Sequence, residues 1–141
     1  MELKSKIFKR FALGLFALFV VNSVANLFYL YQSFSWFDQF MHFSGGVIGG
    51  LFLTWFFFTK YAEYFHKKQF WKIIIINTIL FIIAAGLWEA LEFGVQDWFD
   101  IDYALAEISD SINDVVLGTL GNFLAVFYYY TKIRNQNGGI K

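Results

Sequence analysis

Apolar residues fall in four long runs that short polar connections separate. The runs cover about residues 7–31, 37–59, 70–93 and 112–131. A helix that crosses the hydrocarbon core of a bilayer needs about 20 mostly apolar residues, and each run reaches that length. The sequence therefore predicts an all-α, polytopic integral membrane protein, in which residues 1–134 form a single four-helix transmembrane bundle.

Two segments lie outside these runs. The connection at 94–111 is acidic and aromatic, and we expect an outer loop that carries a short helix at the membrane surface. The tail at 135–141 is rich in Asn and Gly, and we expect it to be disordered. No clear small-residue cleavage site follows the first run, so we expect no cleavable signal peptide.

The composition supports a membrane environment. Hydrophobic residues make up 58% of the chain and the mean hydropathy is +0.51, which is too apolar for a soluble protein of 141 residues. The chain has no Cys, which excludes both a disulfide framework and a thiolate metal site. We expect the lipid bilayer as the main partner and no nucleic-acid partner.

The basic residues predict the orientation in the membrane. All eleven fall in three clusters, at residues 4–10, 60–72 and 132–141. Basic residues favour the cytoplasmic side, and four spans put these three clusters on the same side. Only two of the eleven acidic residues, Glu2 and Glu63, accompany them. We therefore expect a multi-pass protein of the cell membrane with both termini cytoplasmic and an acidic extracytoplasmic side.

The carboxylates Glu89 and Glu92 lie inside the third apolar run. Residues three apart share one face of a helix. An ionisable group in a spanning segment is costly and indicates a functional site. The macrodipole also disfavours carboxylates near the C-terminal end of a helix, so a purely structural role explains this pair poorly.

The other runs place polar residues at the same outer depth. The second run begins with Asp38 and His42, four residues apart, and the fourth begins with Asp110 and Asp114 at the same spacing. The first run carries Asn22, Ser23 and Asn26. Helical bundles build metal and cofactor sites from side chains on facing helices, so we expect one shared site in the bundle interior.

The balance of charge predicts what this site binds. Five carboxylates face one imidazole, and no Lys or Arg lies on the same side of the membrane. Carboxylates without compensation at low dielectric take up protons or a cation. Carboxylates with one imidazole suit a divalent metal cation, either Mg²⁺, Ca²⁺, Mn²⁺, Fe²⁺ or Zn²⁺. The expected metal ligands are Asp38, His42, Glu89, Glu92, Asp110 and Asp114.

We expect Asp38, His42, Glu89 and Glu92 to be the catalytic residues and to contact the metal directly. Asp110 and Asp114 would complete the ligand set or orient it. Simpler interpretations stand beside this one. Asp110 can cap the fourth helix, where Ser111-x-x-Asp114 fits a capping box, and Asp38 can cap the second with His42 bonded to it. Asn22 and Asn26 suit hydrogen bonds between helices.

Glycines recur on two of the predicted helices. Gly45, Gly46, Gly49 and Gly50 form two overlapping Gly-x-x-x-Gly patterns, and the fourth helix has Gly118 and Gly121. Small residues allow helix backbones to approach closely. We interpret the pattern as packing of the bundle, and Gly-rich faces also allow a homo-oligomer.

Three motifs together resemble a known group of proteins. In chain order they are Trp36-Phe37-Asp38-x3-His42-Phe43-x-Gly45-Gly46, Trp88-Glu89-x2-Glu92 and Asp110-x3-Asp114-x3-Gly118-x2-Gly121. From about residue 36 to residue 121 the chain resembles small bacterial membrane proteins of the YjdF-like group, and more distantly the VanZ-like group. The resemblance implies a short helical bundle with the six residues above as a shared site, in a bacterial inner membrane. VanZ-like proteins are associated with glycopeptide-antibiotic resistance, but the resemblance supplies no reaction.

Three functions are compatible with these patterns. The first is a metal-dependent enzyme on the outer side that acts on a lipid or a lipid-linked envelope intermediate, with a carboxylate as general base. The second is a small cation- or proton-handling transporter or its accessory subunit. Polar residues are sparse in the inner half, mainly Asn77, Thr78 and Asn122, and this opposes a complete path through one copy. The third is a structural bundle with a stabilising ion site.

Overall fold

The fold is described from a computed structural model, which describes the backbone of residues 2–60, 70–98 and 104–138. These residues form five helices and no strand. In chain order the helices are α1 (Glu2–Leu27), α2 (Leu30–Ser33), α3 (Ser35–Lys60), α4 (Phe70–Trp98) and α5 (Ala104–Gly138). Four helices are long and apolar enough to cross a membrane, over Ser5–Leu27, Ser35–Phe57, Trp71–Leu91 and Ser109–Thr131. This confirms the predicted all-α membrane bundle with four spans.

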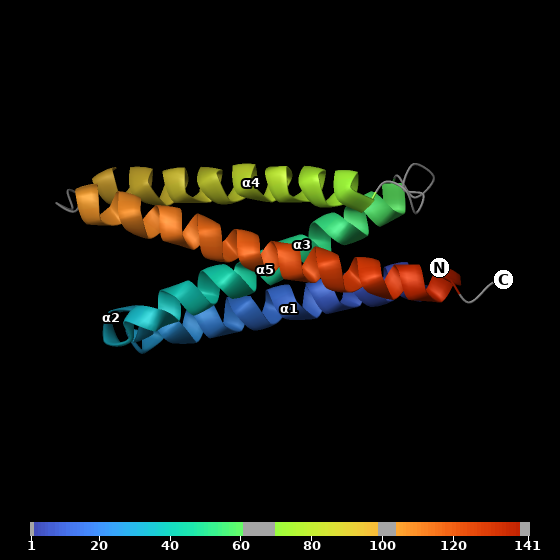
Figure 1. The fold of residues 1–141 in the computed structure, drawn as a ribbon. Helices are drawn as coiled ribbons and strands as arrows, with labels where there is room; N and C mark the ends of the chain where they lie inside the picture. The colour runs from blue at the N-terminus through green and yellow to red at the C-terminus, as the bar shows by residue number, and fades with distance from the viewer. Residues whose placement is uncertain (1, 61–69, 99–103, 139–141) are drawn as a thin grey trace.

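The four long helices alternate in direction along the chain (Figure 1). The start of α1 and the end of α5 lie at one end of the bundle, together with the end of α3 and the start of α4. We call this the basic end, because the described helices carry Lys and Arg only there, at positions 4–10, 60, 72, 132 and 134. The opposite end, where α3 and α5 begin, is called the acidic end. The α3 and α5 helices therefore run in the same direction and cross in an X, with α1 packed on α3 and α4 packed mainly on α5.

Glycines make the crossing of α3 and α5 possible. A Cβ atom on Gly46 would collide with the carbonyl oxygen of Gly118, and one on Gly121 would collide with that of Phe43. A Cβ atom on Gly50 would lie 2.8 Å from the carbonyl oxygen of Asn122. The glycine pattern therefore packs one helix against another within a single chain. Gly45 is different, since a Cβ atom there would meet nothing within 4 Å.

Most large apolar side chains outside the crossing face outward. The buried cluster near the basic end is small and contains Ile7, Leu51, Ala125 and Tyr129. The guanidinium of Arg10 donates a hydrogen bond of 2.8 Å to the hydroxyl of Tyr129, which joins α1 to α5 there. Large exposed apolar residues on every long helix are expected when lipid is the solvent, so this surface supports the membrane assignment.

The first connection differs from the expected one. We expected the first helix to run to about residue 31, but α1 ends at Leu27 and a separate short helix, α2, follows. Tyr29 adopts the left-handed region, with φ 55° and ψ 38°, and this ends α1. A bulky residue rarely takes that conformation, so a local sequence pattern does not predict the break.

The last helices are longer than expected. We expected a loop at 94–111, but α4 continues to Trp98 and α5 begins at Ala104. The sequence Ala104-Leu105-Ala106-Glu107 consists of good helix formers, which explains why α5 starts well before the apolar run. The tail expected to be disordered from residue 135 is helical to Gly138, and residues 139–141 lie outside the described part of the chain.

Candidate metal centre

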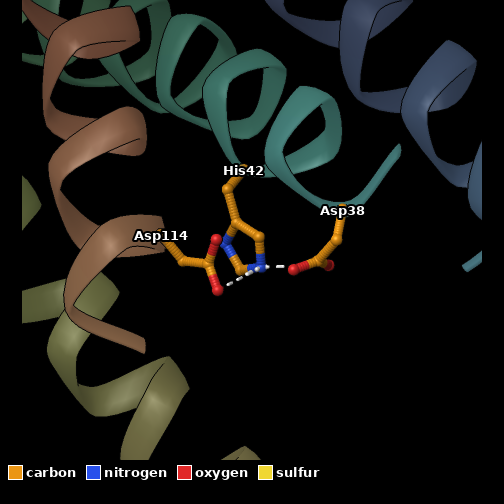
Figure 2. Close-up of side chains that lie close together, drawn as sticks. All are labelled: Asp38, His42 and Asp114. Carbon is orange, nitrogen blue, oxygen red and sulfur yellow. Dashed lines mark ion pairs between the residues drawn. The ribbon is translucent and has the colours of Figure 1, made fainter. Parts of the chain in front are cut away.

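Asp38 and His42 lie on one face of α3, as their spacing predicts. The helix begins at Ser35, so Asp38 lies in its first turn, where the helix dipole favours a negative charge. The Nε2 atom of His42 lies 3.5 Å from Oδ1 of Asp38. Figure 2 shows the imidazole below α3, between the carboxylates of Asp38 and Asp114.

Asp114 approaches the same imidazole nitrogen from α5. Its Oδ2 atom lies 3.6 Å from Nε2 of His42, so two carboxylates converge on one nitrogen (Figure 2). The glycine crossing explains this meeting. Since α3 and α5 run in the same direction and touch at Gly46 and Gly118, the residues one turn earlier on each helix, His42 and Asp114, also face each other.

Glu89 of α4 approaches the other ring nitrogen of His42. Its Oε1 atom lies 3.7 Å from Nδ1 of His42, so each ring nitrogen faces at least one carboxylate. The three acidic side chains come from three helices, and the imidazole lies between them. Among the described residues, Asp38, His42 and Asp114 form a group whose ligand atoms all lie within 4.8 Å of one another.

The four side chains of the cluster differ in exposure. The exposed fraction of the side chain is 35% for Asp38, 20% for His42, 12% for Glu89 and 5% for Asp114. Asp114 is the deepest residue, and its Oδ1 atom is buried without a hydrogen-bond partner among the described residues. Asp38 is therefore the most exposed of the four side chains and Asp114 the most buried.

No basic side chain compensates the three carboxylates. The sequence has no Lys or Arg at 11–59 or at 73–131, which includes everything in the described helices near the acidic end. The imidazole can supply at most one positive charge. Carboxylates without compensation at low dielectric take up protons or a cation.

The capping interpretation of Asp110 and Asp114 is wrong. Because α5 begins at Ala104, both residues lie well inside the helix, where the backbone N–H groups are already bonded within the helix. Ser111 therefore does not begin a capping box. Asp38 does not precede α3 either, since it lies three residues after the helix begins.

The structure does not bring every predicted site residue to His42. Asp110 is exposed on α5, one turn before Asp114. Glu92 belongs to α4, but its side chain lies outside the described residues. The described contacts of His42 therefore involve Asp38, Glu89 and Asp114.

The polar residues of α1 do not join the site. Asn22, Ser23 and Asn26 are exposed and bonded locally. The Tyr31 hydroxyl donates to Oδ1 of Asn22 at 2.7 Å, and the Asn26 amide donates to the Asn22 carbonyl at 2.9 Å. Thus α3, α4 and α5 build the cluster, whereas the expected contribution of the first helix is absent from the described contacts.

Comparison with known proteins identifies the family. No curated protein matches the chain. No solved structure matches it either. A family model described as predicted membrane protein (DUF2238) matches residues 4–135, a range that contains all four spans and the whole carboxylate–imidazole cluster. The chain therefore belongs to the DUF2238 family of predicted membrane proteins.

Proposed function

We propose that this protein binds a divalent metal cation at the acidic end of the bundle, with Asp38, His42 and Asp114 as ligands. The observation that carries the proposal is the convergence of two carboxylate oxygens on one imidazole nitrogen, at 3.5 and 3.6 Å. Two ligands that are each about 2.1 Å from an ion lie about 3.4 Å apart at a tetrahedral angle. The side chains would therefore need to move little to hold an ion.

The electrostatics support a cation. Three carboxylates and one imidazole share a partly buried site, and the neighbouring sequence has no basic residue. Asp114 has a buried carboxylate oxygen without a hydrogen-bond partner among the described residues, and a bound cation would provide one. Oxygen and imidazole nitrogen are ligands for Mn²⁺, Fe²⁺ and Zn²⁺, and for Mg²⁺ or Ca²⁺ when oxygen predominates.

Glu89 would orient His42 and would not bind the metal itself. It faces Nδ1 of His42, whereas Asp38 and Asp114 face Nε2. A histidine that binds metal through one nitrogen commonly donates its other N–H to a carboxylate, which fixes the ring orientation. Glu89 would thus hold the imidazole in position without touching the metal.

The ligand count favours a reactive site over a closed structural one. Three protein ligands leave coordination positions for water or substrate, as in catalytic metal sites. A metal bound there would activate water or polarise a phosphoryl or carbonyl oxygen. The exposure of Asp38 leaves a route for such a substrate. We propose a metal-dependent enzyme acting on a lipid or lipid-linked envelope intermediate, with Glu92 as a further catalytic candidate.

The basic residues support a topology in which the acidic end faces the extracytoplasmic side, so the substrate would come from the outer leaflet. The family match supports the resemblance to YjdF-like proteins. The VanZ-like resemblance rests on the segment from Asp38 to Phe43 and stays a hypothesis.

Metal analysis of the purified protein tests the site. Wild type, Asp114→Asn and Asp110→Asn would be purified in mild detergent, incubated with each divalent cation, and analysed for bound metal after removal of the excess. We expect stoichiometric metal in wild type and in Asp110→Asn, which changes an exposed carboxylate on the same helix, and none in Asp114→Asn. Absence of metal from folded wild type would overturn the proposal.

The same samples separate the three functions. If chelation lowers the melting temperature but no lipid phosphate or acyl ester is cleaved, the ion has a structural role. If sealed vesicles that contain the protein show cation or proton flux that Asp114→Asn abolishes, the transporter is supported. Metal-dependent cleavage of an added lipid or lipid-linked substrate supports the enzyme.

A further inference from the structure

Two amide side chains are fully buried in the half of the bundle toward the basic end. Asn77 of α4 and Asn122 of α5 both have an exposed fraction of 0%. The amide nitrogen and oxygen of each have no hydrogen-bond partner among the described residues. Polar residues in the other long helices bond to their own backbone: Thr54 of α3 donates to the Gly50 carbonyl at 2.7 Å, and Asn26 of α1 donates to that of Asn22.

The packing of Phe81 places the two amides at one depth. The ring of Phe81 on α4 lies between Gly49 and Gly118, since a Cβ atom on Gly49 would be 2.8 Å from the ring and one on Gly118 would be 3.1 Å from it. The α4 and α5 helices are antiparallel (Figure 1). One turn toward the basic end from Phe81 is Asn77, and one turn in the same direction from Gly118 is Asn122.

This layer is separate from the candidate metal centre. Asn122 follows Asp114 by eight residues, which is about 12 Å along a helix. Phe81 lies between the two levels. The bundle therefore has polar groups at two depths, with one aromatic ring between them.

The chemistry of the amides selects the ligand. Each amide offers two N–H donors and one carbonyl acceptor. A direct pair of amides would use one donor and one acceptor of each and leave the second donors unsatisfied. A cation would satisfy only the oxygens, and an anion only the N–H groups. Water donates and accepts, and buried water typically bonds to polar groups that lack other partners.

We propose that Asn77 and Asn122 bind internal water, shared between α4 and α5, within the membrane-spanning part of the bundle. Two neighbouring hydroxyls belong to the same site. The Oγ1 atoms of Thr78 and Thr119 are also buried without a partner, and each lies within one turn of an amide on its own helix. On the α3 side, Gly50 packs against the backbone of Asn122 and closes the layer.

Solid-state NMR in phosphatidylethanolamine–phosphatidylglycerol vesicles tests this directly. Magnetisation would be transferred from water to the assigned side-chain amides of the full-length, uniformly labelled protein. We expect transfer to Asn77 and Asn122 at a rate near that of the exposed amide of Asn113. The buried methyl groups of Val126, one turn beyond Asn122, provide the dry reference. Amides that receive no more water magnetisation than Val126, or that show only a cross-peak to each other, would overturn the proposal.

Paired variants test whether the water is shared. Asn77→Leu should remove the water signal of the Asn122 amide, and Asn77→Ser, which keeps a polar group and leaves room, should retain it. If the leucine variant does not fold, Asn77→Ser and Asn122→Ser still distinguish bound water from a direct amide pair. Serine cannot form an amide pair, so a water signal that persists at the remaining amide supports bound water. An unchanged Asn122 signal in a folded Asn77→Leu protein would contradict a shared site.

Discussion

His42 and Asp114 approach to 3.6 Å between Nε2 and Oδ2, and this contact joins α3 to α5 one turn from the point where Gly46 touches Gly118. The geometry of the candidate site therefore depends on a crossing of two backbones. Because glycine permits that crossing, changes that remove no ligand should still disturb the cluster.

Gly46→Ala is expected to destabilise the bundle and weaken metal binding together. The new Cβ atom would overlap the carbonyl oxygen of Gly118, which is backbone and cannot turn aside. Overpacking of this kind costs about 1–3 kcal/mol. Thermal unfolding in detergent and metal titration measure the two effects. Gly45→Ala is the matched control, since nothing lies within 4 Å of its Cβ position, and it should be neutral or slightly stabilising. Equal effects of the two substitutions would contradict the role of the crossing.

Glu89→Gln is expected to weaken metal affinity without changing the number of ions bound. The carboxylate faces Nδ1 of His42, whereas Asp38 and Asp114 face Nε2. Loss of a group that orients a metal ligand typically costs about 10–100-fold in affinity. Titration with Mn²⁺, followed by electron paramagnetic resonance, gives affinity and stoichiometry. Asp38→Asn should instead abolish binding, and complete loss of the ion in Glu89→Gln would make Glu89 a direct ligand.

Metal affinity is expected to fall as the pH is lowered from about 8 to about 5, because imidazole and carboxylate ligands must be deprotonated to bind an ion. Affinity falls at lower pH because protons compete with the metal: a proton bound by His42, Asp38 or Asp114 removes a metal ligand. Dissociation constants measured across this range in one detergent buffer system check it. Affinity that does not change with pH would show that the ion binds elsewhere.

Phe81→Ala is expected to lower stability by about 3–5 kcal/mol, as for large-to-small changes in packed interiors. The ring fills the space between Gly49 and Gly118. Unfolding by a denaturing detergent at fixed lipid content measures the change. Phe127→Ala on the exposed face of α5 is the control and should have a much smaller effect. A similar loss in both variants would argue against Phe81 as a packing residue.

The topology is testable with single cysteines because the native chain has none. Ser5 and Gln32 are exposed residues near opposite ends of the bundle. A membrane-impermeant maleimide added outside intact cells should label Gln32→Cys and not Ser5→Cys. Permeabilised cells should label both. Labelling of Ser5→Cys in intact cells would place the termini outside and reverse the proposed orientation.

Much of the architecture follows from the order of residues alone. Four runs of apolar residues, each long enough to span a bilayer, determine four helices, because a backbone in hydrocarbon must satisfy its hydrogen bonds internally. The i, i+4 spacing of Asp38 and His42 also determines that they share a face of α3. These features depend only on neighbours along the chain, so they can be read from the sequence. The glycine patterns similarly indicated close packing.

Other features depend on contacts between distant residues. Spacing could not show that Asp114 and Asp38 would meet on one nitrogen of His42 while Glu89 took the other, since this depends on how α3, α4 and α5 cross. Nor could it show that Asn22 and Asn26 would bond within α1 and to Tyr31 instead of facing the cluster. Helix ends were also misjudged at Tyr29 and before Asp110, because the left-handed turn and the early start of α5 do not follow the hydrophobic boundary. The sequence by itself determined the helices and the residues able to bind a cation. The tertiary structure decided which of these residues converge, because backbone packing between the helices sets the direction and depth of each side chain.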